Sequence, residues 1–364
     1  MRICFLAPAN NYHTKKWCKW FSMRGHEIHV VSFVEDNIEH TTVHYINTGA
    51  TAESTDSKKI KYLLKSKEVN KAVKAINPDI INVHYATSYG TVAALAKLDN
   101  YILSVWGSDI YDFPRKSFAH KMLLKYSLKH AKYLFSTSNA MAEETRKYTN
   151  KRIEITPFGV DLSVFTPEKR SRSEYKQGKE EFVVGTVKAL TPKYGIDYLI
   201  KATALIKRDH PDIPIKLHIA GRGESESEYR DLVLRLRLSN DVIWHGFKPQ
   251  DEVATIWANM DLAVVYSSSE SFGVSAVEAQ ACGVPLIISD VPGLMEATQP
   301  GESSIVVPRC NEQELARQIV RLYYDNELRK QMGYNGHKLV EQKYDINYCF
   351  QKVEKLYYSI NKAI

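Results

Sequence analysis

The sequence predicts an α/β protein made of two doubly wound domains. Short apolar segments such as Ile3–Ala9 and Val284–Ile288 alternate with segments of helical periodicity along the chain. Strands that are apolar throughout and separated by helices are typical of parallel sheets covered on both faces. The alternation occurs twice, and 364 residues exceed one ordinary hydrophobic core. We therefore expect two such domains, with a ligand-binding cleft between them at the carboxyl ends of their strands.

The first domain is expected to span residues 1–165. Its first strand, Arg2–Ala7, precedes a helix at Thr14–Met23 that Gly25 ends. Further strands are expected at Ile28–Phe33, Asp79–His84, Tyr101–Val105 and Lys132–Thr137. The next segment, residues 166–181, is polar and lacks apolar periodicity, which is typical of a linker.

The second domain is expected to span residues 182–345. Its strands are expected at Phe182–Lys188, Ile215–Ala220, Val242–His245, Asp261–Tyr266, Leu286–Ser289 and Ser304–Val307. Helical segments separate these strands, among them Gly273–Cys282. We expect residues 346–364 to form a C-terminal helix that packs back on the first domain.

Composition excludes several classes of protein. With 44% apolar and 25% charged residues, the chain is neither disordered nor collagen-like. Its longest apolar runs are far shorter than the about 20 residues that span a bilayer. The first strand begins almost at once, so we expect no cleaved signal peptide. Five cysteines without a C-x-x-C pair indicate reduced thiols, and we expect a cytoplasmic protein without a metal site.

The segment 267–290 carries the strongest chemical signal. Glu270 lies in a serine-rich loop after a strand, and Gly273 begins a helix that carries Glu278. A glycine lets a ligand approach the backbone, and the N-terminus of a helix attracts phosphate. The segment therefore has the outline of a diphosphate site.

Two lysines strengthen this interpretation. Lys188 ends a strand and Lys193 precedes the next helix. Both ammonium groups are expected at the carboxyl edge of the sheet, where two cations neutralise a diphosphate leaving group. Lysines near helix starts are more often simply solvated, so their spacing alone does not identify a site.

Residues 270–285 read E-x-F-G-x-x-x-x-E-A-x-A-x-G-x-P, with the glutamates eight positions apart. This segment resembles the E-x7-E motif of the large retaining GT-B glycosyltransferase family four. The resemblance extends over nearly the whole chain, in family order. Further similar segments lie at 24–33, 155–167, 185–202, 220–224, 242–249 and 290–298.

The resemblance implies roles for these residues. Glu278 hydrogen-bonds the ribose hydroxyls of the nucleotide, and Glu270 holds hydroxyls of the transferred sugar. Lys188 and Lys193 grip the diphosphate. The donor side is further expected to include Ser271, Phe272, Gly273, Val274, Arg222 and Lys248. Members of the family retain the anomeric configuration, by front-side attack in an ion-pair-like transition state. They need a nucleotide-sugar as co-substrate but no metal or other cofactor.

The first domain departs from the family pattern at two places. The first loop of relatives is rich in glycine, whereas here it contains Asn10, Asn11 and no glycine. Asparagine tolerates left-handed backbone geometry, which would preserve the turn. Trp106 stands where many relatives have histidine. Because indole stacks on a sugar face and donates one hydrogen bond, we expect a different contact with the sugar or acceptor.

Three more polar residues are candidates for the sugar or acceptor side. His13 and His84 are expected to face the cleft, although a lone histidine is more often a structural residue. Asp109 follows the same strand as Trp106 and forms an Asp109-x-x-Asp112 pair. That spacing resembles a metal-binding carboxylate set, but a helix cap or a turn is the better interpretation.

The net charge of +7 is unevenly divided. Residues 1–165 carry 23 basic and 15 acidic side chains (+8), and residues 166–364 carry 26 and 27 (−1). Two stretches, 57–76 and 115–132, interleave lysines with apolar residues and hold most of the excess. A charge run is usually a solvated face, yet this composition also suits helices at an anionic membrane surface. No nucleic-acid recognition motif accompanies it.

The sequence thus predicts a metal-independent, retaining hexosyltransferase. We expect it to move a sugar from a nucleotide donor to a hydroxyl of a glycan or lipid-linked acceptor in surface polysaccharide or glycoconjugate biosynthesis. By family frequency the donor is a UDP-sugar. We expect a cytoplasmic protein, peripheral at the inner face of the plasma membrane.

Two alternatives stay open. One is a catalytically weak glycosyltransferase-like subunit that binds a partner enzyme or a membrane. The other is a sugar-nucleotide epimerase of the same fold, which requires an acid/base pair at the sugar rather than E-x7-E. A dinucleotide oxidoreductase is weaker still, because no G-x-G-x-x-G follows any strand.

Overall fold

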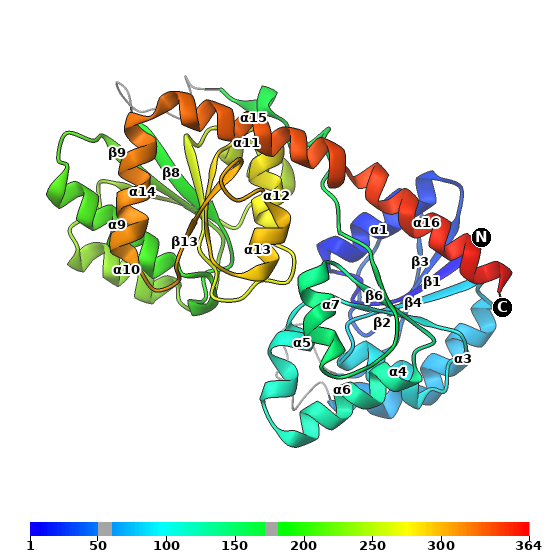
Figure 1. Ribbon diagram of the computed structural model, residues 1–364. Helices are drawn as coiled ribbons and strands as arrows, with labels where there is room; N and C mark the ends of the chain where they lie inside the picture. Colours follow the sequence, from blue (N-terminus) through cyan, green and yellow to red (C-terminus); the bar gives the residue numbers. More distant parts are fainter. Residues whose placement is uncertain (50–59, 172–180, 364) are drawn as a thin grey trace. The chain divides into compact units, whose positions relative to one another are not determined.

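The computed structural model describes residues 1–49, 60–171 and 181–363, and the chain divides into two compact units. Unit 1 comprises residues 1–158 and 350–364, and unit 2 comprises residues 159–349. Each unit contains a parallel sheet with helices on both faces (Figure 1). The expected class of two Rossmann-like α/β domains is confirmed. Residues 57–59 of the first basic stretch and 172–180 of the expected linker lie outside the described residues.

The sheet of unit 1 has seven strands in the order β3-β2-β1-β4-β5-β6-β7. They are β1 (Arg2–Leu6), β2 (Glu27–Ser32), β3 (Thr42–Tyr45), β4 (Ile80–His84), β5 (Ile102–Val105), β6 (Tyr133–Ser136) and β7 (Ile153–Ile155). The helical elements are α1 (Tyr12–Met23), η1 (Ile60–Lys65), α3 (Ser66–Ile76), α4 (Ser88–Leu95), α5 (Ser108–Tyr111), η2 (Phe113–Arg115), α6 (Phe118–His130) and α7 (Asn139–Arg146).

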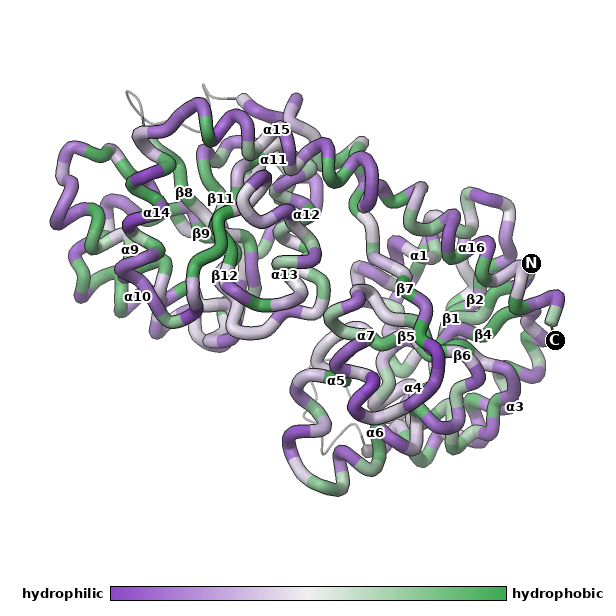
Figure 2. The backbone as a smooth tube through the Cα atoms, in the orientation of Figure 1, coloured by the Kyte–Doolittle hydropathy of each residue, from purple (hydrophilic) through white to green (hydrophobic). Residues whose placement is uncertain are grey.

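Helices cover both faces of this sheet, as the hydrophobic strands in Figure 2 require. Helices α3, α4 and α6 bury one face, and α1 packs on the other (Figure 1). The C-terminal helix α16 (Ile346–Lys362) joins α1 on that second face. Its Phe350 ring lies 4.9 Å from the ring of Trp17, and Glu354 accepts hydrogen bonds from Arg24 and His26. The end of the chain is therefore part of the core of unit 1.

Phe350 should contribute strongly to the stability of unit 1. Its side chain is fully buried and also packs against the rings of Trp20 and Phe21. Phe350→Ala should lower the free energy of unfolding by about 3–5 kcal/mol, because it removes apolar contacts and leaves a cavity. Urea unfolding followed by circular dichroism measures this loss. The matched control Gln351→Ala, an exposed position on the same helix, should change it by less than about 0.5 kcal/mol. Equal effects of the two substitutions would contradict the assignment.

The sheet of unit 2 has six strands in the order β10-β9-β8-β11-β12-β13. They are β8 (Phe182–Val187), β9 (Ile215–Ala220), β10 (Val242–Gly246), β11 (Leu262–Val265), β12 (Leu286–Ser289) and β13 (Ser304–Val307). The helical elements are η3 (Pro167–Lys169), η4 (Pro192–Tyr194), α9 (Ile196–Asp209), α10 (Glu226–Arg235), α11 (Gln250–Ala258), α12 (Val274–Ala281), α13 (Pro292–Ala297), α14 (Glu312–Tyr324) and α15 (Asn326–Lys343). Helices α9, α10 and α14 cover one face, and α11, α12 and α13 cover the other (Figure 1).

Each sheet has a point at which the strand order reverses. In unit 1 strand β1 lies between β2 and β4, and in unit 2 strand β8 lies between β9 and β11. Connections leave the two strands at such a point toward opposite faces, which opens a crevice at their carboxyl ends. The loops after β1 and β4, and those after β8 and β11, are therefore the positions where each unit can hold a ligand.

The structure differs from the sequence expectations mainly at short or polar elements. Strands β3 and β7 were not expected; both are short and lie at the sheet edges. The expected helix 57–76 is described from residue 60 as the 3-10 helix η1 followed by α3. The boundary between the compact units falls after Phe158, whereas the sequence predicts a first domain that ends at residue 165.

Candidate functional site

The reversal point of unit 2 brings together two of the residues expected on the donor side. Lys188 follows β8, Glu270 follows β11, and these two strands are neighbours in the sheet. The Lys188 ammonium donates a hydrogen bond of 2.6 Å to the Glu270 carboxylate, and both side chains are largely buried. The hydroxyl of Ser267 donates to the same carboxylate oxygen at 3.2 Å. The expected cation and the expected sugar-binding carboxylate thus form one polar cluster at the strand ends.

The charge of Lys188 is stabilised in this position. Burial, the largest single effect, lowers the pKa of its ammonium group, whereas the charge and hydrogen bond of Glu270 raise it. Tyr194, whose ring centroid lies 4.6 Å from Nζ, and Glu278 act in the same direction. The net result is a pKa above the ordinary value, so Lys188 is a cation at neutral pH. A buried cation with fixed partners is suited to binding an anion.

Two glycines allow the loops at this edge to approach one another closely. Gly221 has φ +134°, and a Cβ there would collide with the carbonyl oxygen of Lys188. A Cβ on Gly293 would collide with the carbonyl oxygen of Glu270. The backbone of Lys188 is therefore packed directly against the loop at Gly221, and that of Glu270 against the start of helix α13.

Helix α12 begins at this edge and presents its N-terminus. Its N-cap Gly273 has φ +84°, a left-handed conformation that favours glycine. The first N–H groups of a helix lack partners within the helix and carry its positive dipole end. Phe272 is buried against Tyr344, with ring centroids 5.2 Å apart, while Ser271 and Val274 are partly exposed. Glu278, on the same helix, is buried and close enough to influence Lys188.

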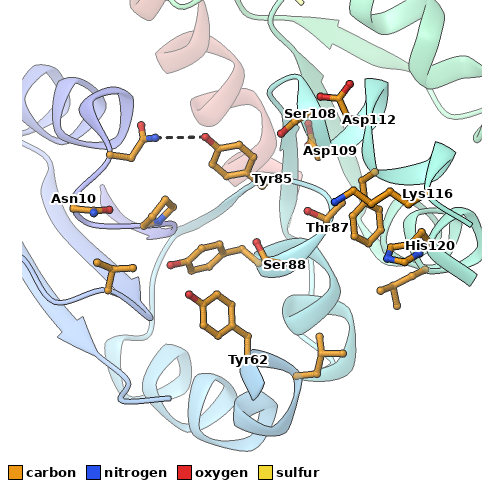
Figure 3. A pocket seen from close by; sticks show the side chains of 17 residues that line it. Asn10, Tyr62, Tyr85, Thr87, Ser88, Ser108, Asp109, Asp112, Lys116 and His120 are labelled. Atoms are coloured by element: carbon orange, nitrogen blue, oxygen red, sulfur yellow. Dashed lines mark hydrogen bonds between the residues drawn. The ribbon is translucent and has the colours of Figure 1, made fainter. Parts of the chain in front are cut away.

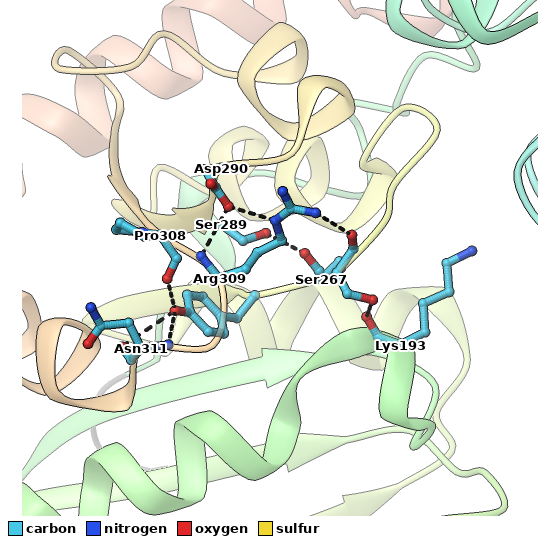
Figure 4. Close-up of polar contacts among 9 residues, drawn as sticks. Lys193, Ser267, Ser289, Asp290, Pro308, Arg309 and Asn311 are labelled. Carbon is cyan, nitrogen blue, oxygen red and sulfur yellow. Dashed lines mark hydrogen bonds and ion pairs between the residues drawn. The ribbon is translucent and has the colours of Figure 1, made fainter.

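The serine-rich loop after β11 is fixed by hydrogen bonds (Figure 4). The hydroxyl of Ser289 donates to the carbonyl of Ser267 at 2.5 Å. Arg309 bridges the carboxylate of Asp290, at 2.8 Å, and the carbonyl of Ser268, at 3.2 Å. The amide of Ser268 donates to the carbonyl of Lys193 at 2.8 Å. Figure 4 shows the Lys193 side chain extending away from this network, so its backbone is held while its ammonium points outward.

Two other expected donor residues have partners of their own. Arg222 lies with its guanidinium 4.7 Å from the ring centroid of exposed Phe247. Lys248 forms an ion pair of 2.6 Å with Glu252, one turn along α11. These two contacts do not involve Lys188 or Glu270.

Unit 1 contains a cavity of about 600 Å³ at its own reversal point (Figure 3). One part of its lining is polar and comes from the ends of β1, β4 and β5. These residues are Asn10, Asn11, Tyr85, Thr87, Ser88, Ser108, Asp109 and Asp112. The other part is mainly apolar and comes from η1, η2, α6 and the ends of β1, β2 and β4, with Lys116 and His120 beside it. Its apolar and aromatic members are Pro8, Val34, Tyr62, Leu63, Tyr89, Phe113 and Leu123.

The asparagine loop of unit 1 does not adopt the expected left-handed geometry. Neither Asn10 nor Asn11 has a positive φ, and Asn11 is extended with φ −78° and ψ 131°. Its side-chain oxygen caps α1 by accepting from the amides of His13, at 2.8 Å, and Thr14, at 3.4 Å. Asparagine at an N-cap needs no positive φ, which explains the absence of glycine. Asn10 is exposed and lines the cavity.

Asp109 organises the backbone behind the cavity. Its buried carboxylate accepts hydrogen bonds from the amides of Ala86, Gly107 and Trp106 at 2.8, 2.7 and 3.2 Å. It thereby ties the end of β4 to the end of β5. Burial raises the pKa of this carboxyl group, although the three amides oppose the effect. The turn-forming interpretation of Asp109 fits these contacts, and the residue also lines the cavity.

His13, His84 and Trp106 lie together near the ends of the central strands of unit 1. They form an aromatic cluster: the ring of His84 lies 4.3 Å from that of Trp106, and His13 stacks on Phe158 at 4.2 Å. His84 is fully buried and Trp106 is 6% exposed. Trp106 therefore packs against the rings of His84, Tyr85 and Phe158. His84 ends strand β4, which is buried on both faces of the sheet, so the sequence did not show that its ring would be enclosed.

The buried His84 should make unit 1 sensitive to acid. Burial lowers its pKa from 6.5 to about 3, and neither ring nitrogen has a hydrogen-bond partner among the described residues. Because the folded pKa lies below the unfolded one, protons bind the unfolded chain first as pH falls. The free energy of unfolding should therefore fall as the pH is lowered from about 6.5 to about 3. Urea unfolding at a series of pH values should show this slope, and His84→Leu should flatten it. The exposed control His130→Leu should leave it unchanged, and an unchanged slope in His84→Leu would refute the account.

Sequence reasoning missed several residues that the structure brings to these sites. Tyr85, at the end of β4, has φ +69° and lies with its hydroxyl 3.4 Å from the Asn11 amide nitrogen. A bulky residue in this conformation is unusual and is held by its surroundings. Its position directly after strand β4 could have indicated from the sequence that Tyr85 lies at the sheet edge. Tyr62, Lys116 and His120 reach the cavity only through tertiary packing, which no local pattern indicates.

The described part of the chain shows neither a metal-binding cluster nor a membrane-spanning helix. No group of three or more His, Cys, Asp or Glu side chains in residues 1–49, 60–171 and 181–363 is arranged to hold a metal ion. Within the same ranges, every helix is too short or too polar to cross a bilayer.

Comparison with known proteins identifies both halves of the chain. Residues 2–138 match the model for glycosyl transferase 4-like domains, and residues 167–339 match that for glycosyl transferases group 1. An uncharacterized glycosyltransferase of Methanocaldococcus jannaschii is 29% identical over 302 residues, which cover 82% of this chain and 80% of the relative. The N-acetyl-alpha-D-glucosaminyl L-malate synthase of Bacillus anthracis is 24% identical over 94% of this chain and 91% of its own.

Solved structures agree in fold. Sucrose-phosphate synthase of Thermosynechococcus elongatus superposes with a TM-score of 0.87 at 19% identity, over the full length of both chains. Anabaena HepE in complex with UDP gives 0.82 at 19% identity, over 99% of this chain and 100% of that one. The protein is thus a GT-B glycosyltransferase. Within that class, the chain belongs to the family-four type, as its E-x7-E segment and the two matched domains show.

Proposed function

We propose that this glycosyltransferase transfers a hexose from a UDP-sugar to a hydroxyl group with retention of configuration. The observation that supports this most is the meeting of Lys188 and Glu270 at the reversal point of unit 2, beside the N-terminus of α12. Cation, carboxylate and helix terminus are the three groups that a sugar diphosphate requires. Anabaena HepE, which shares the fold, was crystallised with UDP.

Each group then has one task in the proposed reaction. Lys188 and the outward-pointing Lys193 neutralise the diphosphate as it leaves, so that a metal ion is not required. Glu270 accepts hydrogen bonds from the sugar hydroxyls, and Glu278 accepts those of the ribose. The bond between the anomeric carbon and the diphosphate oxygen breaks, and the acceptor oxygen bonds to the same face of that carbon. The acceptor proton moves to the departing phosphate oxygen.

The ion pair between Lys188 and Glu270 competes with the contacts that each side chain is proposed to make with the donor. Lys188 cannot bind a diphosphate, nor Glu270 a sugar, with full strength while they bind each other at 2.6 Å. A donor therefore exchanges one protein–protein contact for two protein–ligand contacts. This exchange selects for ligands that carry both an anion and a hydroxyl-bearing sugar.

The acceptor is proposed to bind in the cavity of unit 1. Hydroxyl, amide and aromatic side chains line it, which is the composition of sites that hold sugar rings. We propose a glycan or lipid-linked acceptor of surface polysaccharide or glycoconjugate biosynthesis. The excess positive charge of residues 1–165 suits an acceptor at the inner face of the plasma membrane, reached from the cytoplasm.

A ligand screen tests the proposed donor. Thermal-shift measurements against UDP-, GDP- and ADP-sugars should show stabilisation by a UDP-sugar, because a ligand that binds only the folded state raises its stability. Once an acceptor is found, proton NMR of the product should show the anomeric configuration of the donor. Stabilisation by none of the nucleotide sugars would refute the proposed donor, and an inverted product would refute retention.

A further inference from the structure

The serine-rich loop that carries Glu270 is exposed near its middle and is tied there to a distant segment of the chain. Ser268, two residues before Glu270, is exposed, and its carbonyl accepts a hydrogen bond of 3.2 Å from the Arg309 guanidinium. Arg309 follows β13 and is 41 positions away in the sequence. Such a contact reduces the number of conformations open to a loop. The position of Ser268 therefore depends on Arg309.

Arg309 is itself fixed by the carboxylate of Asp290 (Figure 4). Oδ1 of Asp290 accepts from the Arg309 amide at 3.0 Å and from its Nε at 2.8 Å, which leaves Nη1 to reach Ser268. A planar guanidinium bridges two acceptors in fixed directions, which a lysine ammonium cannot do. Burial raises the pKa of Asp290, but the amide and guanidinium of Arg309 bring it below its ordinary value. The carboxylate is thus charged at neutral pH and holds the guanidinium in place.

The contact at Ser268 lies where two loops of the donor side meet. The Ser268 amide donates to the Lys193 carbonyl at 2.8 Å, so the loop after β11 is joined to the loop before α9. One residue earlier, the Ser267 carbonyl accepts from the hydroxyl of Ser289 at 2.5 Å. Arg309 adds a third attachment, which comes from the loop after β13.

A short path connects this attachment to the carboxylate of Glu270. The hydroxyl of Ser267 donates to Glu270 Oε2 at 3.2 Å, and the Lys188 ammonium donates to the same oxygen at 2.6 Å. Ser267 and Glu270 lie one position before and two positions after Ser268. Because a group that acts in a transition state must be held to within about 0.5 Å, a small shift of this loop is enough to lower turnover.

The ion pair between Asp290 and Arg309 contributes little to the stability of the fold. Its side chains are 40% and 47% exposed, and pairs of this kind have small effects on unfolding. A loss of turnover after removal of Arg309 would therefore not come from unfolding of unit 2.

We propose that Arg309 is a positioning residue, which Asp290 fixes and which holds Ser268 so that the Glu270 carboxylate is aimed at the transferred sugar. Because this role concerns recognition of the donor sugar, it rests on the proposed function. It gives the loop after β13 a part in sugar recognition without a contact to the donor. Turnover should depend on Arg309, whereas binding of UDP, which lacks the sugar, should not.

Variants of Arg309 test the proposal with the full chain. Release of UDP from UDP-hexoses without acceptor should fall at least about tenfold in Arg309→Met, while UDP affinity in calorimetric titration stays within about twofold of the wild type. Arg309→Lys should lose nearly as much turnover, because one ammonium does not replace both guanidinium contacts. The control Arg317→Met removes an exposed arginine that pairs with Glu314 at 2.8 Å, and it should behave like the wild type.

Asp290→Asn tests whether the two residues act together. It removes the charge that fixes the guanidinium, so turnover should fall here as well. The double variant Asp290→Asn/Arg309→Met should be no slower than Arg309→Met, since both residues act through one contact with Ser268. All of these variants should unfold within about 2 °C of the wild type.

The kinetic outcomes that overturn the proposal are distinct. Wild-type turnover in Arg309→Met would show that the attachment does not matter. A loss of UDP affinity in Arg309→Met that Arg309→Lys restores would place the cation on the diphosphate itself. Effects of Asp290→Asn and Arg309→Met that multiply in the double variant would show that the two residues act separately.

Hydrogen exchange followed by mass spectrometry tests the attachment without any turnover. Peptides covering residues 266–272 should exchange at least about fivefold faster in Arg309→Met than in the wild type, and at the wild-type rate in Arg317→Met. Equal exchange in the two variants would overturn the proposal. If the wild type releases no UDP from any UDP-hexose, the proposed function fails, while this measurement still decides whether Arg309 holds the loop.

Discussion

Glu270→Gln should lower sugar transfer and donor hydrolysis by about 10²- to 10³-fold, the loss typical of removing one charged group that acts in the transition state. The substitution keeps the shape of the side chain but removes the charge that Lys188 contacts at 2.6 Å. Binding of UDP, which carries no sugar, should be retained, because Lys188 is then released to the diphosphate. Release of UDP from a UDP-sugar measures the first effect, and calorimetric titration with UDP measures the second.

The control for this variant is Glu226→Gln. Glu226 lies in unit 2 as well, at the start of α10, where it pairs with Arg230 one turn along the helix at 2.8 Å. Its substitution should change turnover by less than about twofold, because exposed helix pairs contribute little. If Glu270→Gln turned over like Glu226→Gln, the carboxylate would not belong to the catalytic site.

Lys188→Met should weaken UDP binding itself, and transfer should fall with it by at least about 10²-fold. Methionine keeps most of the apolar stem that packs in this buried position but has no charge. Calorimetric titration with UDP distinguishes the two roles that the geometry allows. If Lys188 only orients Glu270, Lys188→Met should bind UDP like Glu270→Gln; if it grips the diphosphate, UDP affinity should fall only in Lys188→Met.

The double variant Lys188→Met/Glu270→Gln completes this comparison. Two groups that contact each other should show non-additive effects on stability. Lys188→Met alone leaves a buried carboxylate without its cation, so it should be less stable than the double variant. UDP affinity in the double variant should equal that of Lys188→Met. Restored UDP affinity in the double variant would contradict a direct contact between Lys188 and the diphosphate.

The meeting of Lys188 and Glu270 could be predicted because both residues follow a topological rule. Lys188 and Glu270 are far apart in sequence, yet each comes directly after an apolar strand, and parallel strands end at one sheet edge. The order β9-β8-β11 then makes their strands neighbours. Sequence did not show that the two side chains bind each other, since that depends on the loop contacts of Gly221 and Gly293.

The lining of the unit 1 cavity was harder to predict because tertiary packing, rather than local sequence pattern, decides it. Trp106 follows β5 and His84 ends β4, but their rings pack into an aromatic cluster and are buried. The cavity is instead lined by residues such as Tyr62 of η1 and His120 of α6. A residue's position at a strand end indicates the sheet edge, whereas the neighbouring helices determine whether its side chain reaches solvent.

The central claim is that the reversal point of unit 2 binds and cleaves a nucleotide sugar, and release of UDP tests it most directly. Wild-type protein, Glu270→Gln and Lys188→Met are incubated with a panel of UDP-hexoses without acceptor, and free UDP is measured. The account predicts slow release from at least one UDP-hexose by the wild type and at least about 10²-fold less by both variants. Equal release by all three proteins, or release by none of them from any UDP-hexose, would contradict it.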